Sequence, residues 1–472
     1  MTKPKEKKSS GRPWRDNIEA VTVSIVTIVL FKYFVLEAYK IPTGSMQPTL
    51  MGNTETGIFD RVLVDKFSFH YREPERFEVV VFKYPLNRAQ NFIKRIIGMP
   101  GEELEIRDGD LWVRPAGAAK TTDDDGWRVL RRPRNIEDAQ LRLLETAEEW
   151  RFEDMQAWKL EDGDTLVASK AGRAEFPRTV SIRDRYTDGY PKSLKGKIDV
   201  RTKRFNGANE VSDLRATTTV RAEAATTEVR VVLREGKRRY RFILPGPAAP
   251  ADAKPMVEAF DPEGGMARAT SVATAPWRLA AGAGVDVLAQ NLDDLLTLEL
   301  EDGPTLTLEV PAAGESRAAT VAFETDGAGA RFEDIALYRD IFYTTASQRV
   351  TRWSIPEGNY VMLGDNPQDS SDGRDWQLAG IKVLAGPDSG EVVRGNDRQQ
   401  ENPRWVERPG RESTVFFRDE QGELRWYPTA EVEVLPSMAA PLVSLDSIVG
   451  RAVLVVWPLS PQNDVYRLKW VR

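Results

Sequence analysis

The chain has 472 residues, no cysteine, a single histidine, His70, and a formal net charge of −6. The absence of cysteine excludes disulfides, thiolate nucleophiles and cysteine zinc sites, and one histidine leaves no imidazole cluster for a catalytic zinc. The acidic balance argues against nucleic acid as a partner, because phosphate binding needs a basic surface. The length suffices for two or three domains.

A basic arm and an apolar segment open the chain. Residues 1–17 carry six lysines and arginines against two acids, and Ala20 to Leu36 is apolar with one interruption. Those 17 residues are at the lower limit for crossing a bilayer about 30 Å thick, so we predict a transmembrane anchor over residues 18–37 with a cytoplasmic arm. A cleaved signal peptide is the alternative, but a cut after Ala38 would place Leu36 where a small residue is needed.

The stretch IPTGSMQPTL, residues 41–50, places Ser45 just beyond this segment. Its Gly and Pro content is also typical of an ordinary turn. A nucleophilic Ser45 would need a base, and His70, in the alternating phrase FSFHYREP, is predicted to be a strand residue instead. The remaining practical base is a lysine kept neutral by burial.

The segment NFIKRIIGMPGE, residues 91–102, contains a lysine of this kind. Strand alternation places Lys94 on one face with Phe92 and Ile96, so its neighbours on that face are apolar. Taken alone, the segment favours an edge strand with a solvated lysine, and only its combination with the other segments favours a buried base. A third segment, YVMLGDNPQDSSDGRDW, residues 360–376, begins as an apolar strand and continues into a polar loop. Such loops are usually solvated turns, but this one offers a hydroxyl that could orient a buried lysine.

Taken in order, these segments resemble the bacterial type I signal peptidases, membrane-anchored serine/lysine endopeptidases. IPTGSMQPTL resembles the nucleophile box, NFIKRIIGMPGE the lysine box and MLGDNPQDSSDGRDW the closing box. RVLVDKF, EVVVFKYP and IVGRAVLVVWPLSP resemble further strands of the family. The resemblance implies a mainly β fold, with a signal-peptidase type catalytic domain behind a transmembrane helix.

The resemblance also implies the roles of individual residues. Ser45 would be the nucleophile and Lys94 the general base, with no cofactor and no metal. The implied supporting residues are Thr43, whose hydroxyl joins the Ser45 N–H in the oxyanion hole, Ser370, hydrogen-bonded to the lysine amine, and the ion pairs Asp365 with Arg95 and Asp372 with Arg374.

The chain departs from the family pattern at three places. Phe77 and Glu78 stand where the family usually has Gly-Asp, and Glu102 replaces the usual Asp. Residues 367–369 read Pro-Gln-Asp where Arg-Asp-Asn is commoner, which makes the geometry of that loop uncertain.

Two segments have no counterpart in the resemblance. Residues 114–351 contain alternating stretches such as TTTVRAEAATTEVRVVLREG, which predict an antiparallel β-sandwich of about 12 strands. The phrases NLDDLLTLELEDG and ARFEDIALYRDIFYTT resemble concanavalin A/laminin G-like sandwiches, which often bind glycans. A recruiting module is one interpretation, and a structural insertion on a surface loop is the favoured one. In residues 382–441, FFRDEQGELRWYP predicts a hairpin.

These observations together predict a membrane-anchored endopeptidase that removes signal peptides from exported preproteins. We expect a single-pass protein of the bacterial inner membrane with its catalytic domain on the periplasmic side, and the lipid bilayer, preproteins and a glycan or protein ligand as partners. An inactive homologue that serves as a membrane-anchored binding module is the alternative. The expected division is 1–17 arm, 18–37 anchor, 38–113, 352–381 and 442–472 catalytic domain, and 114–351 and 382–441 insertions.

Overall fold

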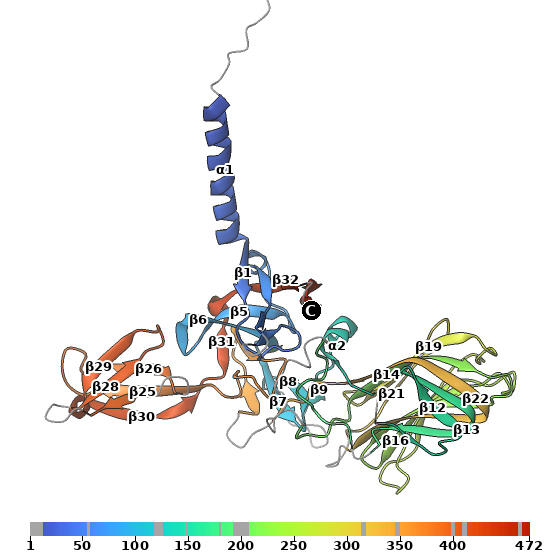
Figure 1. Ribbon diagram of the computed structural model, residues 1–472. Helices are drawn as coiled ribbons and strands as arrows, with labels where there is room; N and C mark the ends of the chain where they lie inside the picture. Colours follow the sequence, from blue (N-terminus) through green and yellow to red (C-terminus); the bar gives the residue numbers. More distant parts are fainter. Residues whose placement is uncertain are drawn as a thin grey trace, which may run out of the picture.

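The structure is a computed structural model in which a central β unit carries a helix and two further β units (Figure 1). The fold is mainly β, as predicted. The 3₁₀ helices are η1 (Ser68–His70), η3 (Thr429–Glu431) and η4 (Leu445–Ser447). The described residues are 13–53, 57–117, 126–146, 149–178, 181–191, 207–312, 318–344, 350–397, 402–407, 413–460 and 465–472.

Helix α1 (Pro13–Phe34) stands away from the central unit (Figure 1). It ends earlier than the predicted anchor, because Leu36 begins strand β1 (Leu36–Lys40), which pairs with β4. Within the part of the chain that the structure describes, no helix combines the length and apolarity needed to cross a membrane. The transmembrane anchor therefore stays a prediction.

The central unit is built on an eight-stranded sheet. Its order is β1-β4-β32-β5-β6-β24-β31, with β35 paired to β32. Two small pairs join it, β2 (Gly52–Asn53) with β3 (Ile58–Phe59) and β33 (Leu459–Ser460) with β34 (Val465–Tyr466). The remaining bounds are β4 (Arg61–Asp65), β5 (Val79–Tyr84), β6 (Asn87–Gly98), β24 (Asn359–Leu363), β31 (Leu442–Ser444), β32 (Ile448–Trp457) and β35 (Lys469–Trp470).

The run VVVF has no polar residue because strand β5 is buried on both faces. Val79 and Val81 pack into one hydrophobic cluster, while Val80, Phe82 and Tyr84 pack into another on the opposite face. A strand buried on both faces gives a continuous apolar run rather than an alternation. The neighbouring strand β6, which carries Lys94, is therefore held against a buried strand.

A second, four-stranded sheet extends the central unit in the order β23-β7-β8-β9. Its core joins Leu104 and Ile106 of β7 to Trp353 and to Ile341 and Tyr343, which follow the sandwich. The end of the inserted segment thus contributes side chains to the hydrophobic core of the central unit. The bounds are β7 (Glu102–Arg107), β8 (Asp110–Pro115), β9 (Arg128–Val129) and β23 (Arg352–Ser354).

The large insertion forms a 13-stranded sheet system around the 21-residue strand β22, which pairs with β10, β13, β14 and β15. Helix α2 (Arg134–Gln140) precedes it. The described strands thus number one more than the predicted 12. The bounds are β10 (Arg142–Leu143), β11 (Arg151–Phe152), β12 (Trp158–Glu161), β13 (Thr165–Phe176), β14 (Leu214–Ala222), β15 (Glu228–Glu235), β16 (Arg238–Pro245), β17 (Met256–Phe260), β18 (Ala269–Val272), β19 (Gly284–Leu292), β20 (Leu295–Leu300), β21 (Thr305–Glu309) and β22 (Ala319–Arg339).

The later insertion forms a small β unit on the opposite side of the central unit (Figure 1). It contains two three-stranded sheets, β26-β25-β30 and β27-β28-β29. Strands β28 and β29 pair as antiparallel neighbours, which confirms the predicted hairpin. The bounds are β25 (Gln377–Val383), β26 (Val392–Asn396), β27 (Arg404–Val406), β28 (Thr414–Arg418), β29 (Leu424–Pro428) and β30 (Val432–Ala439).

The predicted strand around His70 is wrong, because Ser68–His70 is the 3₁₀ helix η1. Asp65 causes the turn: its carboxylate accepts hydrogen bonds from the backbone N–H groups of Phe67 and Ser68 and from the Ser68 hydroxyl. A side chain that captures nearby backbone donors competes with strand pairing. His70 is exposed on this helix.

Candidate active site

Ser45 lies in the turn that follows β1, and the loop after β24 holds this turn in place. The Ser45 carbonyl accepts a hydrogen bond from the Asn366 N–H at 3.1 Å, and the Gly44 carbonyl accepts one from Asn366 Nδ2 at 3.0 Å. Ser45 itself is only 6% exposed. The nucleophile and closing boxes, which lie about 320 residues apart in sequence, are thus joined by backbone contacts.

Lys94 meets Ser45 from the neighbouring strand β6. Its Nζ donates a hydrogen bond to Ser45 Oγ, and the residue is 3% exposed. Burial lowers the pKa of Lys94 to about 8, against 10.5 for an ordinary lysine, because an apolar environment disfavours the ammonium. A lysine with this pKa is partly neutral near physiological pH, so it can accept a proton from the hydroxyl to which it is bonded.

The closing loop approaches this pair so closely that position 364 requires glycine. A Cβ at Gly364 would lie 2.2 Å from Ser370 Oγ and 2.5 Å from the Ser45 carbonyl oxygen. The Gly364 N–H donates to Asp372 Oδ2, which is in turn ion-paired with Arg374. Although burial opposes it, the charge of Arg374 lowers the pKa of Asp372 to about 2. The carboxylate therefore stays ionised beside the lysine.

The expected hydrogen bond between Ser370 and Lys94 is absent from the structure. Ser370 is buried, and among the described residues its Oγ has no hydrogen-bond partner. The recorded hydrogen bond of the Lys94 amine goes to Ser45 instead, and the Ser370 hydroxyl lies over Gly364. Ser370 is therefore near the dyad without orienting its base in this conformation.

Arg95 and Asp365 form the expected ion pair, and both side chains are fully buried. Arg95 donates two hydrogen bonds to the carboxylate, at 2.8 and 2.6 Å, and Thr49 donates a third at 2.6 Å. Because side chains alternate along β6, Lys94 contacts Ser45 while Arg95 pairs with Asp365 beneath the loop.

Two residues outside the predicted set also bind Asp365. Gln140, at the end of α2, donates to Asp365 Oδ1 at 3.2 Å, and Arg142, in β10, donates to the Asp365 carbonyl at 2.6 Å. Both belong to the segment expected to be an independent insertion. No local signal marks them, because their partner is more than 220 residues away.

The two expected oxyanion donors are free in the structure. Among the described residues, neither the Ser45 backbone N–H nor the Thr43 hydroxyl takes part in a recorded hydrogen bond, and Thr43 is exposed. Free donors beside a nucleophile are what a developing oxyanion needs. The same turn thus holds two free donors and a serine hydroxyl that is hydrogen-bonded to a buried lysine amine.

The N-terminal third of the chain is similar to known proteins. Residues 14–170 match the signal peptidase family, peptidase S26. Similar relatives are a probable signal peptidase I-2 from Synechocystis sp. (36% identical over 118 residues) and signal peptidase I proteins from Leptolyngbya laminosa (37% over 109) and Aquifex aeolicus (36% over 92). They confirm the resemblance to type I signal peptidases.

These alignments cover 24%, 21% and 20% of this chain and 51%, 50% and 34% of the three relatives. The chain therefore spans about half the length of the first two. Among solved structures, a galectin from Caenorhabditis elegans, LEC-6, matches 35% of this chain and 94% of its own at 9% identity, with a TM-score of 0.21. A score this low supports no inference about the sandwich.

The departures from the peptidase S26 pattern have local explanations. Phe77 has φ = 70°, a left-handed conformation that glycine adopts freely and that costs other residues about 1 kcal/mol. Its ring is buried against Ile97 and Leu104, which is worth about 1.5–3 kcal/mol, and its carbonyl accepts a hydrogen bond from Arg95. Burial of the ring therefore offsets the strain that glycine would avoid.

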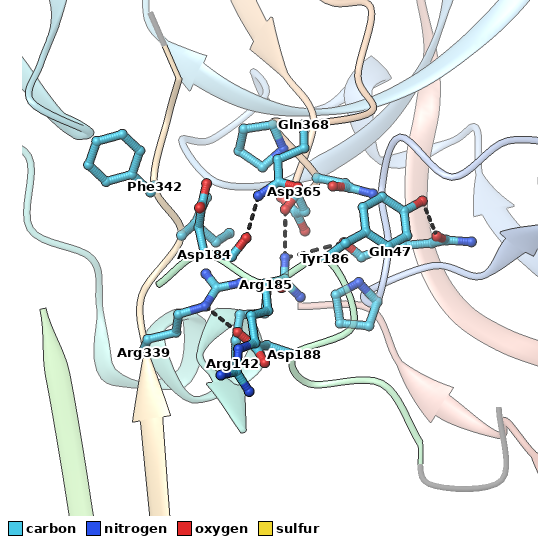
Figure 2. Close-up of a pocket in the computed structure, with 14 residues that line it drawn as sticks. Gln47, Arg142, Asp184, Arg185, Tyr186, Asp188, Arg339, Phe342, Asp365 and Gln368 are labelled. Atoms are coloured by element: carbon cyan, nitrogen blue, oxygen red, sulfur yellow. Dashed lines mark hydrogen bonds and ion pairs between the residues drawn. The ribbon is translucent and has the colours of Figure 1, made fainter. Parts of the chain in front are cut away.

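The substituted loop at 367–369 is one of the parts of the central unit that contact the insertion. Gln368 donates to the Asp184 carbonyl, and Asp369 Oδ2 lies 3.1 Å from the Tyr186 hydroxyl. Figure 2 shows Gln368, Asp184 and Tyr186 around a small cavity of about 30 Å³. Two of the three substituted positions of this loop thus contact inserted residues.

The same inserted segment reaches the nucleophile turn. The Tyr186 hydroxyl lies 3.1 Å from Gln47 Oε1, the Tyr190 hydroxyl also contacts this oxygen, and Arg142 donates to the Gln47 carbonyl at 3.3 Å. A Cβ at Gly44 would lie 3.1 Å from the Tyr186 hydroxyl. The insertion therefore forms part of the wall beside Ser45.

Proposed function

We propose that this protein is a membrane-anchored serine endopeptidase that removes signal peptides from exported preproteins. The observation that carries the proposal is the buried contact of Lys94 Nζ with Ser45 Oγ, together with the lowered pKa of the lysine. The relatives named signal peptidase I support the substrate class. The preferred cleavage site would have small residues at positions −3 and −1.

The reaction follows from the positions of these groups. Neutral Lys94 takes the proton of Ser45 Oγ as the oxygen attacks the scissile carbonyl, and the Ser45 N–H and Thr43 hydroxyl stabilise the oxyanion. The lysine then returns its proton to the leaving amine, which leaves an acyl-enzyme. In the second half Lys94 takes a proton from water, the hydroxide attacks the ester, and the proton returns to Ser45.

Supporting roles fall to the buried ion pairs. Arg95 with Asp365 and Arg374 with Asp372 are all buried, so each carboxylate fixes the loop it belongs to without entering the chemistry. Ser370 would take part only if its hydroxyl turned toward the lysine amine during turnover. An inactive binding homologue is not favoured, because ligand binding alone would not need a serine hydroxyl bonded to a desolvated lysine.

The anchor belongs to the same proposal. The apolar side chains of α1 are largely exposed, which is unfavourable in water and favourable in lipid. They include Ile18, Val21, Val23, Ile25, Val26 and Ile28, each at least 50% exposed. The basic arm would then stay cytoplasmic, with the catalytic unit on the periplasmic side of a bacterial inner membrane. Flotation with liposomes tests the anchor. A protein that did not float with the liposomes would contradict it.

The sandwich would recruit a hydroxyl-rich ligand such as a glycan. A groove of about 660 Å³ crosses β14, β19, β20 and β21, and hydroxyls and carboxylates suit the polar groups of a sugar. Its polar lining comprises Thr217, Thr218, Thr219, Asp286, Glu299, Glu301, Thr305 and Asp334. Calorimetric titration with soluble cell-wall glycan fragments tests this role, with Asp286→Asn as the groove variant. Absence of heat at millimolar ligand would leave the sandwich a structural insertion.

Cleavage of a preprotein by the purified full chain in detergent is the decisive experiment. The preprotein carries an Ala-X-Ala site, and mass spectrometry identifies the products. Ser45→Ala and Lys94→Ala should each lower kcat on the order of 10⁴-fold or more, as expected for members of one catalytic unit.

Matched controls come from exposed residues of the same unit. Lys83→Ala on β5 and Ser354→Ala on β23 remove a lysine and a serine that lie on the surface, so both should keep full activity. Cleavage that persisted in Ser45→Ala, or a folded wild type inert toward several preproteins, would contradict the proposed function.

A further inference from the structure

Three aspartates from distant parts of the chain meet where the sandwich joins the central unit. Asp110 begins β8 of the four-stranded sheet, Asp213 directly precedes β14, and Asp293 lies in the turn between β19 and β20. The carboxylate oxygens that these residues offer lie within 4.8 Å of one another. Asp213 and Asp293 are each only 6% exposed. The structure therefore concentrates negative charge in a place with little water.

The arginine beside Asp293 is already engaged with another acid. Arg132 lies 3.8 Å from Asp293, but its guanidinium already donates two hydrogen bonds to Asp340, a fourth acid at the same junction. Arg132 is thus shared between Asp293 and Asp340.

Asp213 is the member that lacks a partner. Within the described chain no hydrogen bond or ion pair reaches its carboxylate, and the carboxylates of Asp110 and Asp293 lie beside it. The buried carboxylates of Asp365 and Asp372, by contrast, are each paired with an arginine. A buried charge of this kind needs a counter-ion or a proton.

We propose that Asp110, Asp213 and Asp293 bind one divalent cation of the calcium type at this junction. Calcium prefers carboxylate oxygens at about 2.3–2.6 Å, so two oxygens bound to one ion are at most about 5 Å apart. The observed limit of 4.8 Å meets this condition for all three pairs. Magnesium, with bonds of about 2.0–2.1 Å, needs a more compact and nearly octahedral set. Water would complete the coordination.

The position of the cation gives it a structural role. One ligand belongs to the peptidase-like sheet and two belong to the sandwich, so the ion ties the two units together. The sandwich side of this junction also supplies Arg142 and Tyr186, which contact the Ser45 and Asp365 loops. A rigid junction therefore holds Arg142 and Tyr186 in position to make these contacts. This inference concerns cation binding and does not depend on the proposed peptidase activity.

Calcium titration of the full-length protein tests the proposal. The protein in detergent is stripped with EDTA, dialysed, and titrated with CaCl₂ in a calorimeter, while its thermal unfolding is followed in parallel. We expect one calcium per chain and a Tm that rises by about 2–5 °C at saturating calcium. MgCl₂ should give a smaller rise, and NaCl at matched ionic strength none.

Two isosteric substitutions identify the site. Asp213→Asn keeps the side-chain shape and removes one negative charge, so the metal-free variant should melt at or above the metal-free wild type and show no calcium response. Asp252→Asn removes an exposed charge elsewhere on the sandwich and should respond like the wild type. If Asp213→Asn does not fold, Asp110→Asn, at the half-buried ligand, makes the same comparison.

Three results would overturn the proposal. Absence of both heat and a Tm shift at millimolar calcium would mean that protons neutralise the cluster. An unchanged calcium response in Asp213→Asn or Asp110→Asn would place the ion elsewhere. An equal response to magnesium would refute the assignment to a calcium-type cation.

Discussion

The pH dependence of cleavage tests the central feature of the site, a lysine that burial keeps partly neutral near physiological pH. Burial lowers the pKa of Lys94 from 10.5 to about 8. About a tenth of the buried lysine is then neutral at pH 7, compared with about three parts in ten thousand for an exposed one. Burial alone thus raises the available base by a few hundredfold at neutral pH.

The expected result is a rise in kcat/KM of about tenfold between pH 7 and pH 9, with an apparent pKa near 8, because kcat/KM reports ionisation in the free enzyme. Initial rates of preprotein cleavage in detergent, measured at constant ionic strength, give the profile. Lys83→Ala on the adjacent strand is the control and should leave the profile unchanged. A flat profile over this range, or a midpoint near 10.5, would refute the reasoning.

The same pKa has a consequence for stability. A lysine whose pKa is lower in the folded state opposes folding wherever it is protonated. That penalty is complete below about pH 8, shrinks as the pH rises and is gone above the unfolded pKa of 10.5. The shift corresponds to about 3 kcal/mol at pH 7. Lys94→Met should therefore be inactive yet at least as stable as the wild type at pH 7, and denaturant unfolding would measure the difference.

Three further substitutions test the supporting contacts. Asp365→Asn leaves Arg95 buried without its ionised partner and should lower the free energy of unfolding by about 3–5 kcal/mol, measured by urea denaturation; a loss below 1 kcal/mol would contradict the buried pair. Gly364→Ala places a methyl group 2.2 Å from Ser370 Oγ and should abolish cleavage, and retained activity would argue against the packed loop. Tyr186→Phe removes a hydroxyl within reach of two acceptors and should cost about 1 kcal/mol of stability while changing preference among preproteins; unchanged kcat/KM for every substrate would refute its role beside the site.

The dyad was predicted from several segments together and from their resemblance to the signal peptidases, because each segment alone was also compatible with an ordinary turn or an edge strand. Strand alternation in NFIKRIIG placed Lys94 on an apolar face, and the strand β6 has that form. The apolar run of β5 and the β28–β29 hairpin are also features of short, continuous stretches of sequence. Where a side chain captured the backbone instead, as Asp65 does before His70, alternation gave the wrong element.

Contacts between remote segments could not be predicted from the sequence. Gln140 and Arg142 bind Asp365 across more than 220 positions, and Tyr186 reaches the nucleophile turn across more than 130. Such contacts have no period and no fixed spacing, so nothing local marks them. The missing Ser370 hydrogen bond is likewise a matter of where one hydroxyl lies in the folded loop.

The sequence by itself therefore indicated which residues are candidates for the chemistry, because the composition left lysine as the practical base and the order of the segments resembles that of the signal peptidases. Only the tertiary structure decided what surrounds that chemistry. It brought the insertion against the nucleophile turn, placed Phe77 in a left-handed conformation beneath the site, and gathered Asp110, Asp213 and Asp293 at one junction. Each of these depends on how separate sheets pack, and packing between sheets is set by the whole chain and not by any short stretch of it.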